Sequence, residues 1–319
     1  MLSEVGSILV TGGAGFVGSW LLGELLAIGG VSRITVLDNL SNGRRAHVPD
    51  SPRIALEEIE LSDPAAVERV VERCRPDIVF HLAALHFIPY CNAHQARTME
   101  VNVVGTQALL DACRRYPPSR VVIASSVAVY SVRDGANAEE SVVAPVDIYG
   151  LSKWINERQL ELYSTECPES TRCAVARFSN VYGPRETNPH VIPEILAQLA
   201  ARRTTIALGN VKPKRDYIYA PDVARALIAI VERSEQRFRI YNVGTGREYS
   251  VEEIVACLSR ISGRPLEIAV DPSRVRATDR MHLLCDLSRI ESELGWRPSY
   301  TMEAGMTELW QTLEAGDAE

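Results

Sequence analysis

The stretch TGGAGFVG, residues 11–18, decides how the chain is expected to fold. Its glycines Gly12, Gly15 and Gly18 mark the junction of the apolar run ILVTG, residues 8–12, with the apolar segment FVGSWLLGELLAIGG, residues 16–30. Glycines at this spacing permit a tight turn and let backbone N–H groups approach a pyrophosphate at the positive end of a helix. The stretch therefore predicts a dinucleotide-binding turn. A simple tight turn is the alternative, because the common fingerprint is GxGxxG and this variant shifts one glycine.

Segments typical of strands and of helices alternate after this turn. The strand patterns are 8–12, 33–38, 53–61, 77–84, 120–126 and 171–179, and helical patterns separate them. This order predicts an α/β protein: a Rossmann-type doubly wound parallel sheet with a smaller mixed α/β C-terminal substrate lobe. We expect the dinucleotide-binding domain to span 1–179, with about 215–250 returning to it. The lobe is expected to comprise 180–214 and 251–319.

Composition excludes several classes of protein. The 319 residues carry a net charge of −7, which disfavours nucleic acid and anionic membranes as partners. No apolar run approaches the ~18 residues of a membrane span, and the N-terminus lacks the basic leader of a signal peptide. The seven cysteines are scattered without a CxxC pair, which predicts a cytoplasmic protein without disulfides. Cys91 and His94 have a metal-like spacing but no second ligand pair, so no metal is expected.

Asp38 indicates which dinucleotide would bind. It ends the second strand pattern, 20 residues after Gly18, where a carboxylate can accept both hydrogen bonds from an adenosine ribose. The same charge would repel a 2′-phosphate, so NAD is predicted rather than NADP. Arg44 and Arg45 follow in a polar loop, where solvated side chains are the simpler interpretation.

The stretch YGLSK, residues 149–153, offers a candidate general base. Lys153 follows Tyr149 by four residues, so both would lie on one helical face. A cation held there favours the phenolate and lowers a tyrosine pKa that is ordinarily about 10. Two ordinary helix residues are the alternative interpretation, because the motif is short.

The chain resembles the extended short-chain dehydrogenase/reductase family, and within it the NAD-dependent nucleotide-sugar epimerases and dehydratases such as the UDP-glucose/galactose 4-epimerases. The resemblance extends from about residue 7 to 310. It rests on ordered motifs: TGGAGFVG, LDNLSNGRR, HLAA, NVVGT, SSVAVY, YGLSK, RFSNVYGPR, RDYIYAPDVA, YNVGTG and LGWRP.

The resemblance implies NAD as the cofactor and a nucleotide sugar, with UDP favoured, as the substrate. It assigns the catalytic roles to Ser126, Tyr149 and Lys153. The implied cofactor-binding residues are Gly12, Gly15, Phe16, Val17, Gly18, Asp38, Asn39, Asn42, Glu60, Leu61, Ala83, Asn102, Tyr149 and Lys153. The implied substrate-binding residues are Ser126, Asn180, His190, Val191, Leu208, Arg215, Arg276 and Leu283.

Comparison with the family pattern also shows positions where this chain differs, and it implies a quaternary structure. Family members often carry aspartate where this chain has Glu60, and Asp279 is expected to orient Arg276. Leu283 leaves acceptance of N-acetylated sugars open. The resemblance also implies a homodimer through the helices near 93–115 and 148–166, although Trp154, Ile155 and Leu162 could equally be core residues.

The predicted reaction is 4-epimerisation of a nucleotide sugar, a UDP-hexose by preference, through a transient 4-keto sugar. Val127 and Ala128 follow Ser126 and cannot exchange a proton, which disfavours a 4,6-dehydratase. Thr187 stands where glucuronate epimerases tend to have an arginine, which disfavours a uronic acid. The alternatives are a 4,6-dehydratase or a 4-ketosugar reductase of the same family and, more distantly, a non-catalytic NAD-sensing protein.

Overall fold

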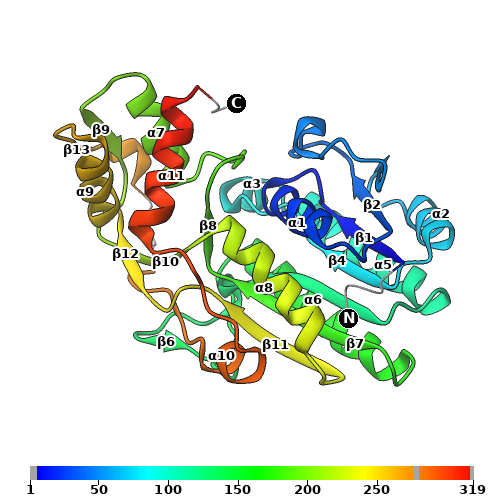
Figure 1. Cartoon of the computed structure of the whole chain (residues 1–319). Helices are drawn as coiled ribbons and strands as arrows, with labels where there is room; N and C mark the ends of the chain where they lie inside the picture. The colour runs from blue at the N-terminus through cyan, green and yellow to red at the C-terminus, as the bar shows by residue number, and fades with distance from the viewer. Residues whose placement is uncertain (1–5, 276–279, 317–319) are drawn as a thin grey trace.

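A computed structural model describes residues 6–275 and 280–316, and its larger part is built on a seven-stranded parallel sheet (Figure 1). Successive strands across the sheet are β11 (Phe238–Val243), β7 (Arg172–Phe178), β5 (Arg120–Ser126), β4 (Ile78–His81), β1 (Ser7–Thr11), β2 (Arg33–Asp38) and β3 (Ile54–Glu58). The strand order reverses between β1 and β4, the place where open α/β sheets bind ligands. The predicted doubly wound sheet is confirmed, and the returning segment supplies its seventh strand.

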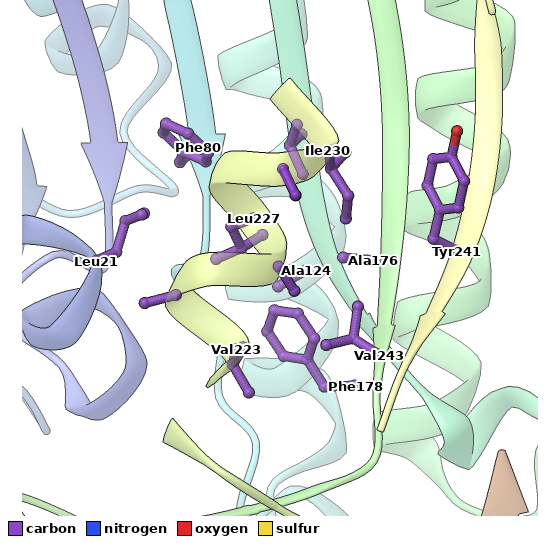
Figure 2. Close-up of a cluster of buried hydrophobic side chains, with 14 of the residues drawn as sticks. Leu21, Phe80, Ala124, Ala176, Phe178, Val223, Leu227, Ile230, Tyr241 and Val243 are labelled. Atoms are coloured by element: carbon purple, nitrogen blue, oxygen red, sulfur yellow. The ribbon is translucent and has the colours of Figure 1, made fainter. Parts of the chain in front are cut away.

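Helices cover both faces of this sheet, because fully apolar parallel strands must be buried on both sides. On one face lie α1 (Phe16–Ala27), α8 (Ala220–Arg233) and α10 (Ser288–Leu294). On the other lie α2 (Pro64–Cys74), α5 (Gly105–Arg115) and α6 (Ile148–Glu166). Figure 2 shows Val223, Leu227 and Ile230 of α8 over the strands, close to Phe80 and Ala124. Truncating such a leucine to alanine typically costs about 2–5 kcal/mol.

The smaller lobe has a hydrophobic cluster of its own. A three-stranded sheet places β10 (Lys214–Tyr219) between β12 (Glu248–Ser250) and β8 (Asn180–Tyr182). Beside it lie the pair β13 (Glu267–Val270) and β9 (Thr205–Leu208), with helices α7 (Val191–Ala200), α9 (Val251–Ser262) and α11 (Met302–Glu314) (Figure 1). The division into domains stays a prediction. Within the segment expected in the lobe, side chains from Leu283 to Trp296 belong to the cluster of the large sheet.

The connecting segments are short. They comprise α3 (Ile88–Ala93), α4 (Gln95–Met99), the 3₁₀ turns Arg45–His47, Val127–Val129 and Pro272–Arg274, and the pair β6 (Ala136–Asn137) with β14 (Leu284–Cys285). The helix expected near 93–115 is divided by a π-helical turn, Glu100–Val104, before α5 begins. Such turns are frequent at functional sites. No helix in the described part of the chain has the length and apolar character needed to cross a membrane.

Candidate active site

A cavity of about 1230 Å³ runs from the carboxyl ends of the large sheet into the smaller lobe. It brings together almost all residues that the sequence singled out, although they come from segments far apart in the chain. The predicted site residues on its wall are Gly12, Gly15, Phe16, Val17, Gly18, Asp38, Asn39, Asn42, Glu60, Leu61, Ala83, Ser126, Tyr149, Lys153, Asn180, His190, Val191, Leu208, Arg215 and Leu283. Arg276 and Asp279 lie outside the described residues.

The glycine turn leaves no room for a side chain at Gly12 or Gly18. Gly12 has a φ of +71°, and a Cβ atom there would lie 2.7 Å from the Ala83 nitrogen. A Cβ atom on Gly18 would lie 2.3 Å from the Gly12 oxygen. Helix α1 begins at Phe16 with no side chain capping its first turn. The first N–H groups of the helix can therefore donate to phosphate oxygens, which fits the predicted dinucleotide.

The part of the cavity that is predicted to hold the adenosine presents two carboxylates. Asp38 accepts hydrogen bonds from the backbone nitrogens of Ala14 (3.0 Å) and Leu40 (2.9 Å), which fix its orientation. Glu60 accepts from Asn39 Nδ2 at 2.9 Å and from Arg97 Nη2 at 2.7 Å. Burial opposes ionisation, but these hydrogen bonds lower the pKa of Glu60.

The second oxygen of Glu60, Oε1, is buried and has no hydrogen-bond partner in the described part of the protein. A buried acceptor left in this way fits a donor on the ligand, such as an amino group. The glutamate that departs from the expected aspartate therefore still suits an adenine contact.

Asn102 lies behind the cavity wall. It is fully buried in the π-helical turn, where its side chain bonds to both backbone polar groups of Leu85 and to Ser152 Oγ. Because Leu85 lines the cavity and Ser152 precedes Lys153, Asn102 holds the loop and α6 together. A direct contact of Asn102 with cofactor stays a prediction.

The three predicted catalytic residues meet where β5 ends and α6 begins. Asp147 caps α6 by accepting from the Gly150 nitrogen at 2.7 Å. A Cβ atom on Gly150 would lie 2.6 Å from the Ala128 oxygen, so glycine allows α6 to pack against the turn that follows Ser126. Lys153 Nζ donates to the Ala124 oxygen at 2.8 Å and lies 5.9 Å from the centre of the Tyr149 ring.

Burial sets the ionisation of this group. It raises the pKa of Tyr149, which a hydrogen bond with Ser126 partly offsets, and it lowers the pKa of Lys153 to about 8. The sequence argument expected the lysine to lower the tyrosine pKa, but within the chain alone desolvation of the phenolate is the larger effect. The oxidised nicotinamide of NAD carries a positive charge, which would favour the phenolate when bound here.

In the part of the cavity predicted to bind the substrate, His190 belongs to a polar cluster whose other members were not singled out from the sequence. His190 pairs with Glu186, and His86 Nε2 lies 2.7 Å from Asn188 Nδ2. Burial lowers the pKa of His86 to about 4 and raises the pKa of Glu186. His86 lines the cavity. In the described residues, no group of three or more His, Cys, Asp and Glu side chains is arranged to bind a metal ion.

Residues 8–244 match the sequence profile of the NAD dependent epimerase/dehydratase family. The chain belongs to this family. A UDP-glucose 4-epimerase from Corynebacterium glutamicum, 32% identical over 311 residues, covers 92% of this chain and is itself covered to 91%.

Two solved structures of similar proteins share its fold over nearly the whole length. The UDP-glucose 4-epimerase of Thermus thermophilus in complex with NAD has a TM-score of 0.86 and 31% identity, covering 97% of this chain and 99% of its own. The UDP-glucose 4-epimerase of Thermotoga maritima with UDP-glucose has a TM-score of 0.88 and 28% identity, with the same coverage. This member of the epimerase/dehydratase family is an NAD-dependent enzyme of the epimerase type, and the predicted family, cofactor and fold are confirmed.

Proposed function

We propose that the chain is a nucleotide-sugar 4-epimerase whose preferred substrate is a UDP-hexose. The observation that supports this most directly is the meeting of Ser126, Tyr149 and Lys153 on the wall of one cavity, between the glycine turn and the smaller lobe. The relatives named UDP-glucose 4-epimerase, including the one solved with UDP-glucose, support the choice of base and sugar.

The proposed mechanism assigns one task to each side chain. The Tyr149 phenolate accepts the proton of the sugar 4-hydroxyl and later returns it, while Ser126 donates a hydrogen bond to the same oxygen. The Lys153 ammonium group places a positive charge near the Tyr149 ring, which favours the phenolate. When bound, NAD would supply the acceptor for the hydride that leaves C4 of the sugar and would return that hydride to C4, so that the cofactor is unchanged after each turnover. The cavity has to let the 4-keto sugar present its other face before the hydride returns.

The residues after Ser126 favour epimerisation over loss of water. Val127 and Ala128 are buried and apolar, so neither can supply the extra acid or base that elimination requires. A dehydratase or a 4-ketosugar reductase of the same family is the alternative function.

The test uses UDP-glucose and UDP-galactose carrying deuterium at C4, with dTDP- and GDP-hexoses in parallel. We expect NMR to show interconversion of the C4 epimers, with deuterium retained at C4 because the hydride returns to the sugar. A product lighter by one water in mass spectrometry would replace this proposal with a dehydratase. Stoichiometric reduction of added NAD, with the deuterium transferred from C4 to the cofactor and a 4-keto sugar left as product, would replace it with a reductase running in reverse.

We further propose that the protein acts as a cytoplasmic homodimer. Val104 of the π-helical turn, and Trp154 and Leu162 of α6, are exposed apolar side chains on neighbouring elements. Leu162 is 57% exposed, so it is not a core residue. The free, buried cysteines of the described residues fit a reducing compartment.

Leu162→Glu is expected to shift the protein from dimer to monomer, because a charge would then have to be buried in the interface. Light scattering coupled to size exclusion measures the mass directly. Val270→Glu is the matched control, since Val270 is equally exposed but lies on β13 in the smaller lobe. A monomeric wild-type protein, or a dimeric Leu162→Glu variant, would contradict this interface.

A further inference from the structure

Arg280 has a buried hydrogen-bond donor with nothing to bind. Its side chain lines the cavity, and Nη2 donates to the Ala128 oxygen at 3.2 Å. Nη1 is buried and has no hydrogen-bond partner among residues 6–275 and 280–316. Within those residues Arg280 forms no salt bridge; burial lowers its pKa, and the charge of Asp147 offsets this only in part.

Two other arginines with little exposed surface, Arg177 and Arg289, have the anionic partners that Arg280 lacks. Arg177 pairs with Glu157, both side chains being 3% exposed, and Arg289 lies beside Glu139 and Glu140. A guanidinium stays charged, and burying it without a compensating anion costs stability. Retaining such a group on the wall of a substrate cavity indicates that the compensating anion arrives with the substrate.

The position of Arg280 narrows down where that anion would lie. The Ala128 oxygen that accepts from Arg280 also packs against Gly150, the residue after Tyr149. On its other side, Arg215 Nη1 donates to the backbone oxygen of Arg280 at 2.6 Å. Arg280 thus stands between the catalytic tyrosine and Arg215, beside the place proposed for the reacting sugar.

We propose that Arg280 binds an oxyanion of the substrate next to the sugar ring and so determines which substrates bind. This rests on the proposed function, and it adds Arg280 to the arginines that the family resemblance assigns to the diphosphate. A guanidinium pairs with the delocalised oxygens of phosphate and carboxylate alike. The oxyanion is therefore either the sugar-linked phosphate or a carboxylate on the sugar, and the experiment separates the two.

Arg280→Met is compared with wild type in the NAD-loaded protein by calorimetric titration of UDP, dTDP, GDP, UDP-glucose and UDP-glucuronate. We expect Kd to rise about 10- to 100-fold for at least one probe, as for the loss of a hydrogen bond between charged groups. If the affinity falls for UDP, dTDP, GDP and both nucleotide sugars, the oxyanion bound by Arg280 is the phosphate. If it falls for UDP-glucuronate alone, the oxyanion is the sugar carboxylate.

Two controls separate binding from folding. Arg280→Lys keeps the charge without the planar fork and should give an intermediate Kd. Because Arg280 is unpaired within the described protein, the ligand-free melting temperature of Arg280→Met should equal or exceed that of wild type. Arg289→Met, which breaks a paired arginine outside the cavity wall, should instead melt lower and bind every probe like wild type.

Different results would contradict the role of Arg280 and the proposed epimerase reaction. Unchanged affinities of Arg280→Met for all five probes, or a wild-type protein that binds none of them, would overturn the role of Arg280. Wild type that binds UDP-glucose without epimerising it would overturn the proposed reaction, and a weakened Arg280→Met would still establish the oxyanion site.

Discussion

Tyr149→Phe is expected to lower kcat for C4 epimerisation by about 10³-fold while leaving bound NAD and KM close to wild type. The variant removes the only atom in the proposed mechanism that accepts the proton of the 4-hydroxyl, and positioned general bases typically contribute 10²- to 10⁴-fold. Phenylalanine retains the ring, so packing around α6 should persist. Initial rates of interconversion of UDP-glucose and UDP-galactose provide the measurement.

The control for Tyr149 is a second tyrosine of the same helix. Tyr163 is fully buried and bonds through its hydroxyl to the Cys113 oxygen at 3.3 Å, outside the cavity wall. Tyr163→Phe should therefore keep its kcat.

Since burial lowers the pKa of Lys153 to about 8, the wild-type rate should fall as pH rises through that value and the cation is lost. A Tyr149→Phe variant with more than a tenth of wild-type kcat would remove this residue from the mechanism.

The parts of the site that could be predicted from sequence are those that depend on short segments. The glycine turn, Asp38 and the Tyr149–Lys153 pair each lie at the end of a strand or within one helical turn, so spacing alone indicates their geometry. A parallel sheet then brings these strand ends to one edge without further information. The confirmed sheet and cofactor both follow from this local chemistry.

The rest of the site depends on contacts between distant segments. Arg280 reaches Ala128 across 152 positions of the chain, and His86 reaches Asn188 across 102. Neither pair has a fixed spacing that a single sequence could show. The tyrosine pKa is a similar case, because its direction depends on how deeply neighbouring segments bury the ring. Such features become visible only when the lobe is packed against the sheet.

Arg177→Met is expected to destabilise the fold by about 3–5 kcal/mol, because it leaves the Glu157 carboxylate buried and unpaired. Arg177 donates to Glu157 through Nε at 2.8 Å and Nη2 at 2.6 Å, and Ser125 Oγ donates to the same carboxylate at 2.5 Å. Chemical denaturation of the variant, followed by circular dichroism, measures the change in the free energy of unfolding.

The double variant Arg177→Met/Glu157→Leu separates two quantities. One is the net contribution of the ion pair to the free energy of unfolding, and the other is the cost of leaving one buried charge unpaired. Removing both charges leaves no buried carboxylate to desolvate, so the double variant should recover most of the lost stability. Its kcat should nevertheless stay below wild type, because Glu157 ties α6, which carries Tyr149 and Lys153, to Ser125 beside the proposed catalytic residue Ser126. A double variant as unstable as Arg177→Met would show instead that the pair itself stabilises the fold.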